Sequence, residues 1–263
     1  MRLYWEIARR GYRRYAAYPG ATLAGIFTNT IFGFMLAYIL LAVFRERDTV
    51  GSYDAVDAVT YVWLSQGLLM TVYLWGWYDV ALRVQSGEVA TDLQRPLDFQ
   101  GYWLAQDLGR GLYHALFRGV PPFLVGLLVF DVRLPGDPLV WFAFPLSVAL
   151  AVTASFAFRF LWNLTAFWLL DYRGVAILAS VASSFFSGQY IPIAFFPDAL
   201  ATVAWALPFA AMVQAPVEVF LGHARGVELL GLLAVQAFWA LALLLAGRAV
   251  YGSGTRKLVI QGG

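Results

Sequence analysis

The chain has 263 residues, of which 61% are apolar and only 13% are charged, and its formal net charge is +2. Soluble domains are roughly 45–50% apolar and about 25% charged, so this composition excludes a water-soluble globule and predicts an all-α integral membrane protein. The sequence has no cysteine, which excludes disulfides and thiolate metal sites, and the small positive charge does not indicate nucleic-acid binding. We expect a single transmembrane domain over residues 1–263.

Residues 1–18 predict an amphipathic helix in the cytoplasmic interface. At about 100° per residue, the apolar and aromatic side chains, among them Trp5, share one face, and the opposite face carries Arg9, Arg10 and Arg13. The segment is too charged for a signal peptide, and no cleavage site follows it. The helix is either an anchor that sets orientation or a lever that moves during transport.

Six apolar stretches are long enough, at roughly 20 residues, to cross a bilayer. They are residues 21–44, 59–78, 119–130 (extended back to 113), 139–170, 174–193 and 228–247. The third is the weakest, because Arg118 interrupts it. We expect the span interiors to be free of charge except for Asp79 and Arg159 near the cytoplasmic ends. Arg159 should either extend to the inner interface or pair with Asp79 or Asp171.

The placement of arginine and lysine predicts the orientation. Basic residues gather in the N-terminal segment, in the second and fourth loops and in the C-terminal tail, whereas the alternate loops are more acidic. Both termini should therefore be cytoplasmic. We expect a multi-pass protein of a bacterial plasma membrane.

Residues 197–222 are apolar enough to be a seventh span, but that span would place Arg256 and Lys257 outside the cell. Pro208 and Pro216 would also break a helix here. We expect two short re-entrant helices in the outer leaflet. Their broken backbone must be buried against protein or a water-filled cavity.

Residues 86–97 are the most structured cytoplasmic loop. Ser86 can cap a helix whose first turn holds Glu88. Asp92 and Arg95 are spaced to pair on the surface of this helix, and Pro96 ends it. A short charged helix at this face suits docking to a soluble partner. The alternative is a plain interfacial loop.

No catalytic constellation is visible. The sequence lacks the phosphate-binding G-x-x-x-x-G-K-[ST] loop, H-E-x-x-H and G-x-S-x-G, so we expect neither an enzyme nor a cofactor or metal bound by this chain. Charge-free spans offer no proton or ion relay. If the protein moves a substrate uphill, the energy should come from another subunit.

Three other side chains have two readings each. Tyr73 and Trp77 crowd the inner end of the second span, where aromatic residues are typically interface anchors, although they can also form a cation–π surface for a lipophilic cation. Glu218, near the outer face, is either solvated or a cargo contact.

Three stretches in their order resemble the permease subunits of type-2 ATP-binding-cassette exporters, the ABC-2 type, in the viologen or multidrug exporter branch. They are residues 1–18, residues 87–97 with the core Leu93-Gln94-Arg95-Pro96, and residues 187–197 followed by Leu207-Pro208-Phe209. The resemblance covers the whole chain. It implies an elbow helix at 1–18, a coupling helix at 86–97 and re-entrant outer helices at 197–222.

The resemblance also implies roles for particular residues. Contact with a separate ATPase would be made by Glu88, Val89, Asp92, Leu93 and Arg95. The re-entrant signature would consist of Ser187, Gly188, Pro192, Pro197 and Pro208.

The implied function is export of small amphipathic or cationic molecules. A second permease subunit, identical or different, would complete the path, and ATP with Mg²⁺ would act in the partner ATPase. Two alternatives remain open, namely export of a lipid-linked glycan or polysaccharide, and a membrane scaffold or assembly factor without cargo.

Overall fold

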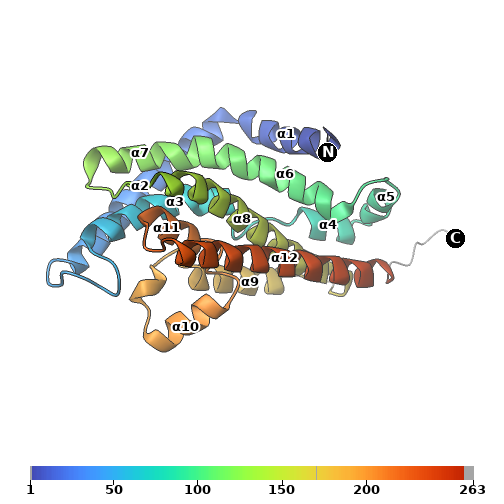
Figure 1. Cartoon of the computed structure of the whole chain (residues 1–263). Coiled ribbons are helices and arrows are strands. Elements are labelled where there is room, and N and C mark those ends of the chain that lie inside the picture. The colour runs from blue at the N-terminus through green and yellow to red at the C-terminus, as the bar shows by residue number, and fades with distance from the viewer. Residues whose placement is uncertain (1, 170, 258–263) are drawn as a thin grey trace.

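The computed structural model describes residues 2–169 and 171–257, and all their regular elements are helical (Figure 1). In chain order these are α1 (Arg2–Ala16), α2 (Pro19–Val43), α3 (Ala55–Val72), α4 (Asp79–Gln85), α5 (Val89–Leu93), α6 (Phe99–His114), η1 (Ala115–Gly119), α7 (Val120–Val129), α8 (Pro138–Asn163), η2 (Leu164–Phe167), α9 (Arg173–Phe186), η3 (Ile193–Phe195), α10 (Asp198–Ala206), α11 (Gln214–Leu221) and α12 (Val227–Thr255). The predicted all-α class is confirmed.

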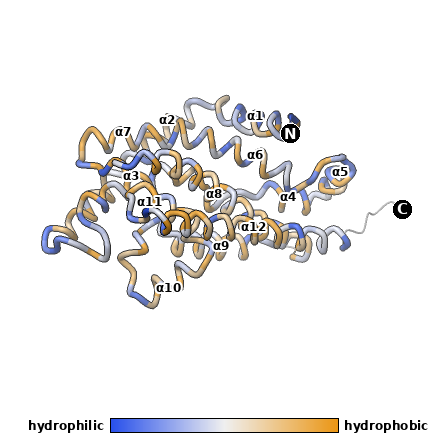
Figure 2. The backbone as a smooth tube through the Cα atoms, in the orientation of Figure 1, coloured by the Kyte–Doolittle hydropathy of each residue, from blue (hydrophilic) through white to orange (hydrophobic). Residues whose placement is uncertain are grey.

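Within these described residues, five helices are long and apolar enough to cross a membrane. They are α2, α3, the joined helix Phe99–Val129, the joined helix Pro138–Phe167, and α12. Their outer surfaces carry large exposed apolar side chains such as Phe27, Phe142 and Leu230, as contact with lipid requires. In Figure 2 hydrophobic residues run along these helices, and hydrophilic residues gather at the ends of the bundle. The chain is an integral membrane protein.

The predicted fifth span is shorter than expected. α9 has 14 residues, which at about 1.5 Å each is roughly 21 Å, less than the roughly 30 Å of a hydrocarbon core. The helix ends because Gly188 turns the chain with a φ of +76°. Residue 170, the predicted end of the fourth span, lies outside the described residues.

The prediction of a third span over residues 113–130, preceded by a loop, was wrong about where the helix begins. Residues Phe99–Val129 form one helix of 31 residues, with the π-helical turn η1 inside it. The hydropathy of the sequence detects only the second half of this helix, which is apolar. The polar half folds as a helix because it packs against α1, α3 and α8.

α1 lies lengthwise on α6 (Figure 1). Two glycines permit this close approach. A Cβ on Gly109 would lie 1.9 Å from the Ala8 carbonyl oxygen, and a Cβ on Gly11 would lie 2.4 Å from the Gln106 carbonyl oxygen. The helix presents its arginines outward, including Arg9, Arg10 and Arg13. Trp5 is 65% exposed, so it does not join the face that packs on α6.

The start of α1, the end of α12, and α4 and α5 all lie at the same end of the bundle (Figure 1). We call this the terminal end. The opposite end holds the start of α3, the loop between α7 and α8, and His223, which ion pairs bring together. α3 is the centre of the core, with 72% of its apolar window buried against 17% for α12.

Candidate functional site

A buried ion-pair cluster joins three helices near the terminal end. Asp107 of α6 accepts hydrogen bonds from Arg159 Nη2 of α8 and from Arg110 Nε, both at 2.7 Å. Arg110 also donates to the carbonyl oxygens of Met70 and Thr71 in the last turn of α3, at 2.5 and 3.1 Å. All three charged side chains are buried. One carboxylate that accepts from two guanidinium groups fixes α3, α6 and α8 relative to one another.

Tyr73 and Trp77, two predicted cargo contacts, lie against this cluster. The Arg110 guanidinium carbon is 4.8 Å from the Tyr73 ring centroid, and that of Arg159 is 5.3 Å from Tyr73 and 5.4 Å from Trp77. Tyr73 ends α3 in the left-handed conformation, with a φ of 60°. Arginines of the chain itself therefore occupy the aromatic surface that could otherwise hold a cationic cargo.

The expectation for Arg159 was wrong in both of its forms. The side chain neither extends to the interface nor pairs with Asp79 or Asp171, because it is fully buried on Asp107, 52 residues away. The expected absence of charge from the spans is overturned as well. A signal was present in the sequence, since four polar or aromatic residues repeat at helical spacing on one face. They are Trp103, Asp107, Arg110 and His114.

The predicted coupling helix over residues 86–97 is shorter in the structure. α5 covers only Val89–Leu93, because Gly87 turns the chain just before it with a φ of +78°. The N-cap residue is Glu88 rather than Ser86, although the Ser86 hydroxyl oxygen accepts a hydrogen bond from the Glu88 backbone N–H at 3.5 Å. Asp92 and Arg95 pair at 3.2 Å, as their spacing predicts.

The predicted ATPase contacts form an exposed set and a buried set. The exposed set is Glu88, Leu93 and Arg95. The buried set is Val89 and Asp92. Asp92 accepts a hydrogen bond from Arg83 Nη1 at 2.7 Å, and the Arg83 guanidinium lies 5.7 Å from the Trp103 ring of α6. An exposed surface is thereby connected to a membrane-crossing helix.

At the opposite end, Gln214 is fully buried and connects four segments. Its side-chain amide donates to the hydroxyl of Tyr53 at 2.8 Å and to Glu218 at 2.6 Å. Its side-chain oxygen accepts from the Ile193 backbone N–H at 3.1 Å, and its own backbone N–H donates to the Ser187 carbonyl at 3.0 Å. The start of α11 is thus attached to η3, to the end of α9 and to the loop before α3.

The predicted signature residues occupy the turns around Gln214. The Gly188 carbonyl accepts a hydrogen bond from the hydroxyl of Tyr61 in α3. Pro192 and Pro197 immediately precede η3 and α10, and Pro208 lies in the turn between α10 and α11. α10 and α11 have 9 and 8 residues. Neither is long enough to cross a bilayer, so residues 197–222 do not contain a seventh span.

His223 links α11 to the start of α3. Its Nδ1 lies 2.7 Å from Glu218 Oε2, and its Nε2 lies 3.4 Å from Asp57 Oδ2. Hydrogen bonds to Asp57 and Glu218 raise the pKa of His223 to about 9, although partial burial opposes this. Arg133 donates to Asp57 and to Asp54, both at 2.5 Å, and so adds the loop after α7 to the same network.

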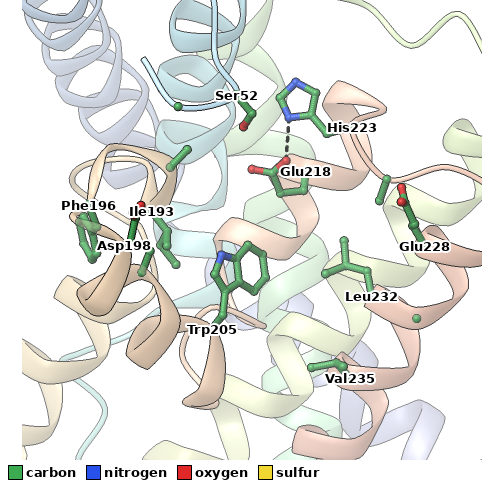
Figure 3. Close-up of a pocket in the computed structure, with 15 residues that line it drawn as sticks. Ser52, Ile193, Phe196, Asp198, Trp205, Glu218, His223, Glu228, Leu232 and Val235 are labelled. Atoms are coloured by element: carbon green, nitrogen blue, oxygen red, sulfur yellow. Dashed lines mark hydrogen bonds and ion pairs between the residues drawn. The ribbon is translucent and has the colours of Figure 1, made fainter. Parts of the chain in front are cut away.

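A pocket of about 690 Å³ opens beside this network (Figure 3). Its walls come mainly from η3, α10 and the first turns of α12, and α11 adds Glu218. The acidic lining residues are Asp198, Glu218 and Glu228, and the indole of Trp205 points into the pocket from α10. Glu218 lines the pocket while already accepting the hydrogen bond from His223. The parts of the chain that the structure describes hold no group of acidic residues and histidines arranged for a metal ion.

The protein-family profile described as "ABC-2 family transporter protein" matches residues 27–262. The chain belongs to the ABC-2 transporter family. It is therefore the membrane-spanning permease component of an ABC transporter, which works with an ATPase subunit and is not itself the catalytic part. Neither the curated proteins nor the solved structures gave a significant match. The match to the ABC-2 permease begins within α2, so α1 lies outside it.

Proposed function

We propose that this permease is the membrane subunit of an ATP-driven exporter, and that its terminal end faces the cytoplasm. The observation that carries the proposal is the exposed surface of α5. The Arg83–Asp92 ion pair and the Trp103 ring connect it to α6, and the buried Asp107 cluster connects α6 to α3 and α8. The exposed arginines of α1 at the same end support this orientation. ATP and Mg²⁺ act in the partner ATPase, and a second permease subunit, identical or different, completes the path.

The contacts suggest how force passes from the ATPase into the membrane. A displacement of α5 moves Arg83 through Asp92, and Arg83 lies on the Trp103 ring of α6. Asp107, one turn further along α6, then carries the displacement to Arg159 of α8. Because buried charge pairs are costly to break, the three helices move together rather than separately.

The test is co-expression with an ABC-type ATPase encoded beside the permease. Leu93→Asp places a charge on the exposed docking surface and should lower co-purification of the ATPase by about tenfold, which corresponds to about 1.4 kcal/mol. Asp92→Asn should leave co-purification largely intact but reduce transport-coupled ATP hydrolysis. Arg225→Gln, an exposed change at the opposite end, is the control. An ATPase that neither co-purifies nor changes activity with the permease would refute the proposal.

We further propose that the cargo is a small amphipathic or cationic molecule that leaves through the pocket beside α10. Supporting this are the carboxylates of Asp198 and Glu228, and the Trp205 indole available for a cation–π contact. Cells with the complex should resist lipophilic cations, and Glu228→Gln or Trp205→Ala should lower the resistance severalfold. Equal sensitivity of cells with and without the complex across a broad panel would exclude this cargo class.

A further inference from the structure

Arg118 lies inside a membrane-crossing helix and has no ion-pair partner within residues 2–169 and 171–257. Its Nε is buried without a hydrogen-bond partner. The turn η1 places the guanidinium over Gly25 of α2, where an added Cβ would lie 2.1 Å from Nη2. The glycine therefore makes room for the arginine. An arginine in this position is costly unless an anion reaches it.

His114, one turn closer to the terminal end, is a second buried side chain whose nitrogens lack hydrogen-bond partners among the described residues. The side chain is 3% exposed, and neither ring nitrogen has a hydrogen-bond partner. Its ring packs edge-on against Tyr15 of α1, with the ring centroids 4.8 Å apart. Asp107, the acid on the same face of α6, is already engaged by two arginines. Two nitrogen-bearing side chains near the junction of α1, α2 and η1 thus lack an acceptor.

The surroundings limit what can supply that acceptor. At this level of the bundle, the exposed surface of α2 and of residues 112–120 carries large apolar side chains, namely Leu23, Phe27, Leu112, Leu116, Phe117 and Val120. An anion that approaches through this surface must itself carry an acyl chain.

The depth fits a lipid headgroup. Gly25 is six residues past the start of α2, or about 9 Å along the helix axis. Side chains of a helix lean toward its N-terminus, which for Arg118 is the terminal end, so the guanidinium can reach a phosphate at the interface. We propose that Arg118, with His114 behind it, binds the phosphate headgroup of an anionic phospholipid where α2 crosses η1.

The experiment measures the thermal stability of the purified permease in detergent. Added phosphatidylglycerol should raise Tm by several degrees, whereas phosphatidylcholine with the same acyl chains and inorganic phosphate should not. Arg118→Gln should lose most of this shift. Gly25→Ala should also reduce it while keeping the arginine, because the new methyl group displaces the guanidinium. The control Arg225→Gln removes one exposed charge elsewhere and should keep the full shift.

Native mass spectrometry of the lipid that co-purifies provides a readout independent of stability. We expect wild-type protein to retain phosphatidylglycerol and Arg118→Gln to retain about fivefold less, equivalent to about 1 kcal/mol. A full phosphatidylglycerol shift in Arg118→Gln would overturn the proposal, as would an equal shift with phosphatidylcholine. An equal response to inorganic phosphate would identify a site for free anions and would overturn the lipid assignment. None of these outcomes depends on the ATPase or on cargo.

Discussion

At the scale of single residues, we expect Asp107 to matter most for the stability of the helix bundle. Its carboxylate accepts from Arg110 and Arg159, and Arg110 also donates to the carbonyl oxygens that end α3. Arginine, with a planar group and several donors, suits such a role better than lysine would. The last turn of α3, the middle of α6 and the C-terminal half of α8 therefore share one electrostatic junction.

Replacing Asp107 by asparagine should destabilise the permease strongly, because it leaves two buried arginines without an anion. Breaking a buried pair in this way typically costs about 3–5 kcal/mol. Thermal unfolding in detergent should show a drop of many degrees, whereas Asp171→Asn, at an exposed carboxylate, should change little. The double variant Asp107→Asn with Arg159→Met should recover part of the loss. Strictly additive losses would show that the two side chains are not coupled.

The pH dependence of stability should report on His223. Its pKa of about 9 in the folded protein lies above the ordinary value of 6.5, so its stabilising contribution is full below about pH 6.5 and is lost as pH rises through 9. Allowing for solvent screening of a partly exposed site, we expect about 1–2 kcal/mol. The groups that contact it are Asp57, Glu218 and Tyr53, and Arg133 pairs with Asp57.

The check is Tm measured between pH 6 and pH 10 for wild type and for His223→Gln. Wild-type Tm should fall more steeply between pH 7 and pH 9.5, and the two curves should converge at the alkaline end. Curves that stay parallel over the whole range would contradict a protonated His223 in the folded state.

At the scale of elements, the contact between α1 and α6 depends on two glycines. Gly109→Ala should separate the helices, because the new methyl group would lie 1.9 Å from a backbone oxygen that cannot move away cheaply. Limited digestion with trypsin should then cut faster at the arginines of α1. Gly252→Ala in α12 is the matched control, since nothing lies near that position. Equal digestion rates for the two variants would show that α1 does not need this approach.

The sequence predicted the apolar helices well because lipid imposes a simple rule on them. α2, α8 and α12 lie where hydropathy places spans, and Pro208 correctly indicated that no long helix crosses between α9 and α12. The short α10 and α11 follow from the same proline pattern. These features depend on the residues of a single segment.

What the sequence could not provide depends on partners that are distant in the chain. The first half of the joined helix Phe99–Val129 looks like a loop because Gln100, Asp107 and Arg110 lower its hydropathy, and only the packing of α1, α3 and α8 makes it a buried helix. The partner of Arg159 is 52 residues away. His223 and Asp57 are 166 residues apart, and no local spacing indicates that contact.

At the scale of the whole molecule, the orientation can be tested directly because the chain has no cysteine. Glu46→Cys places a thiol in the loop before α3, and Arg256→Cys places one just after α12. In intact cells a membrane-impermeant maleimide should label only the first variant, and after permeabilisation it should label both. The reverse pattern would place the terminal end outside the cell and would contradict the proposed docking of an ATPase on α5.

The two helices between α9 and α12 differ in how firmly they are held. α11 is buried over most of its length and is attached through Gln214, whereas only Ala204 of α10 is buried. The pocket therefore has the compliant α10 on one side, and the firmly held Glu218 of α11 with the first turns of α12 on the other. Backbone amides of α10 should exchange with deuterium much faster than those of α11. A cavity bounded in this way can change its width without disturbing the bundle, which would let one exit accept molecules of different shapes.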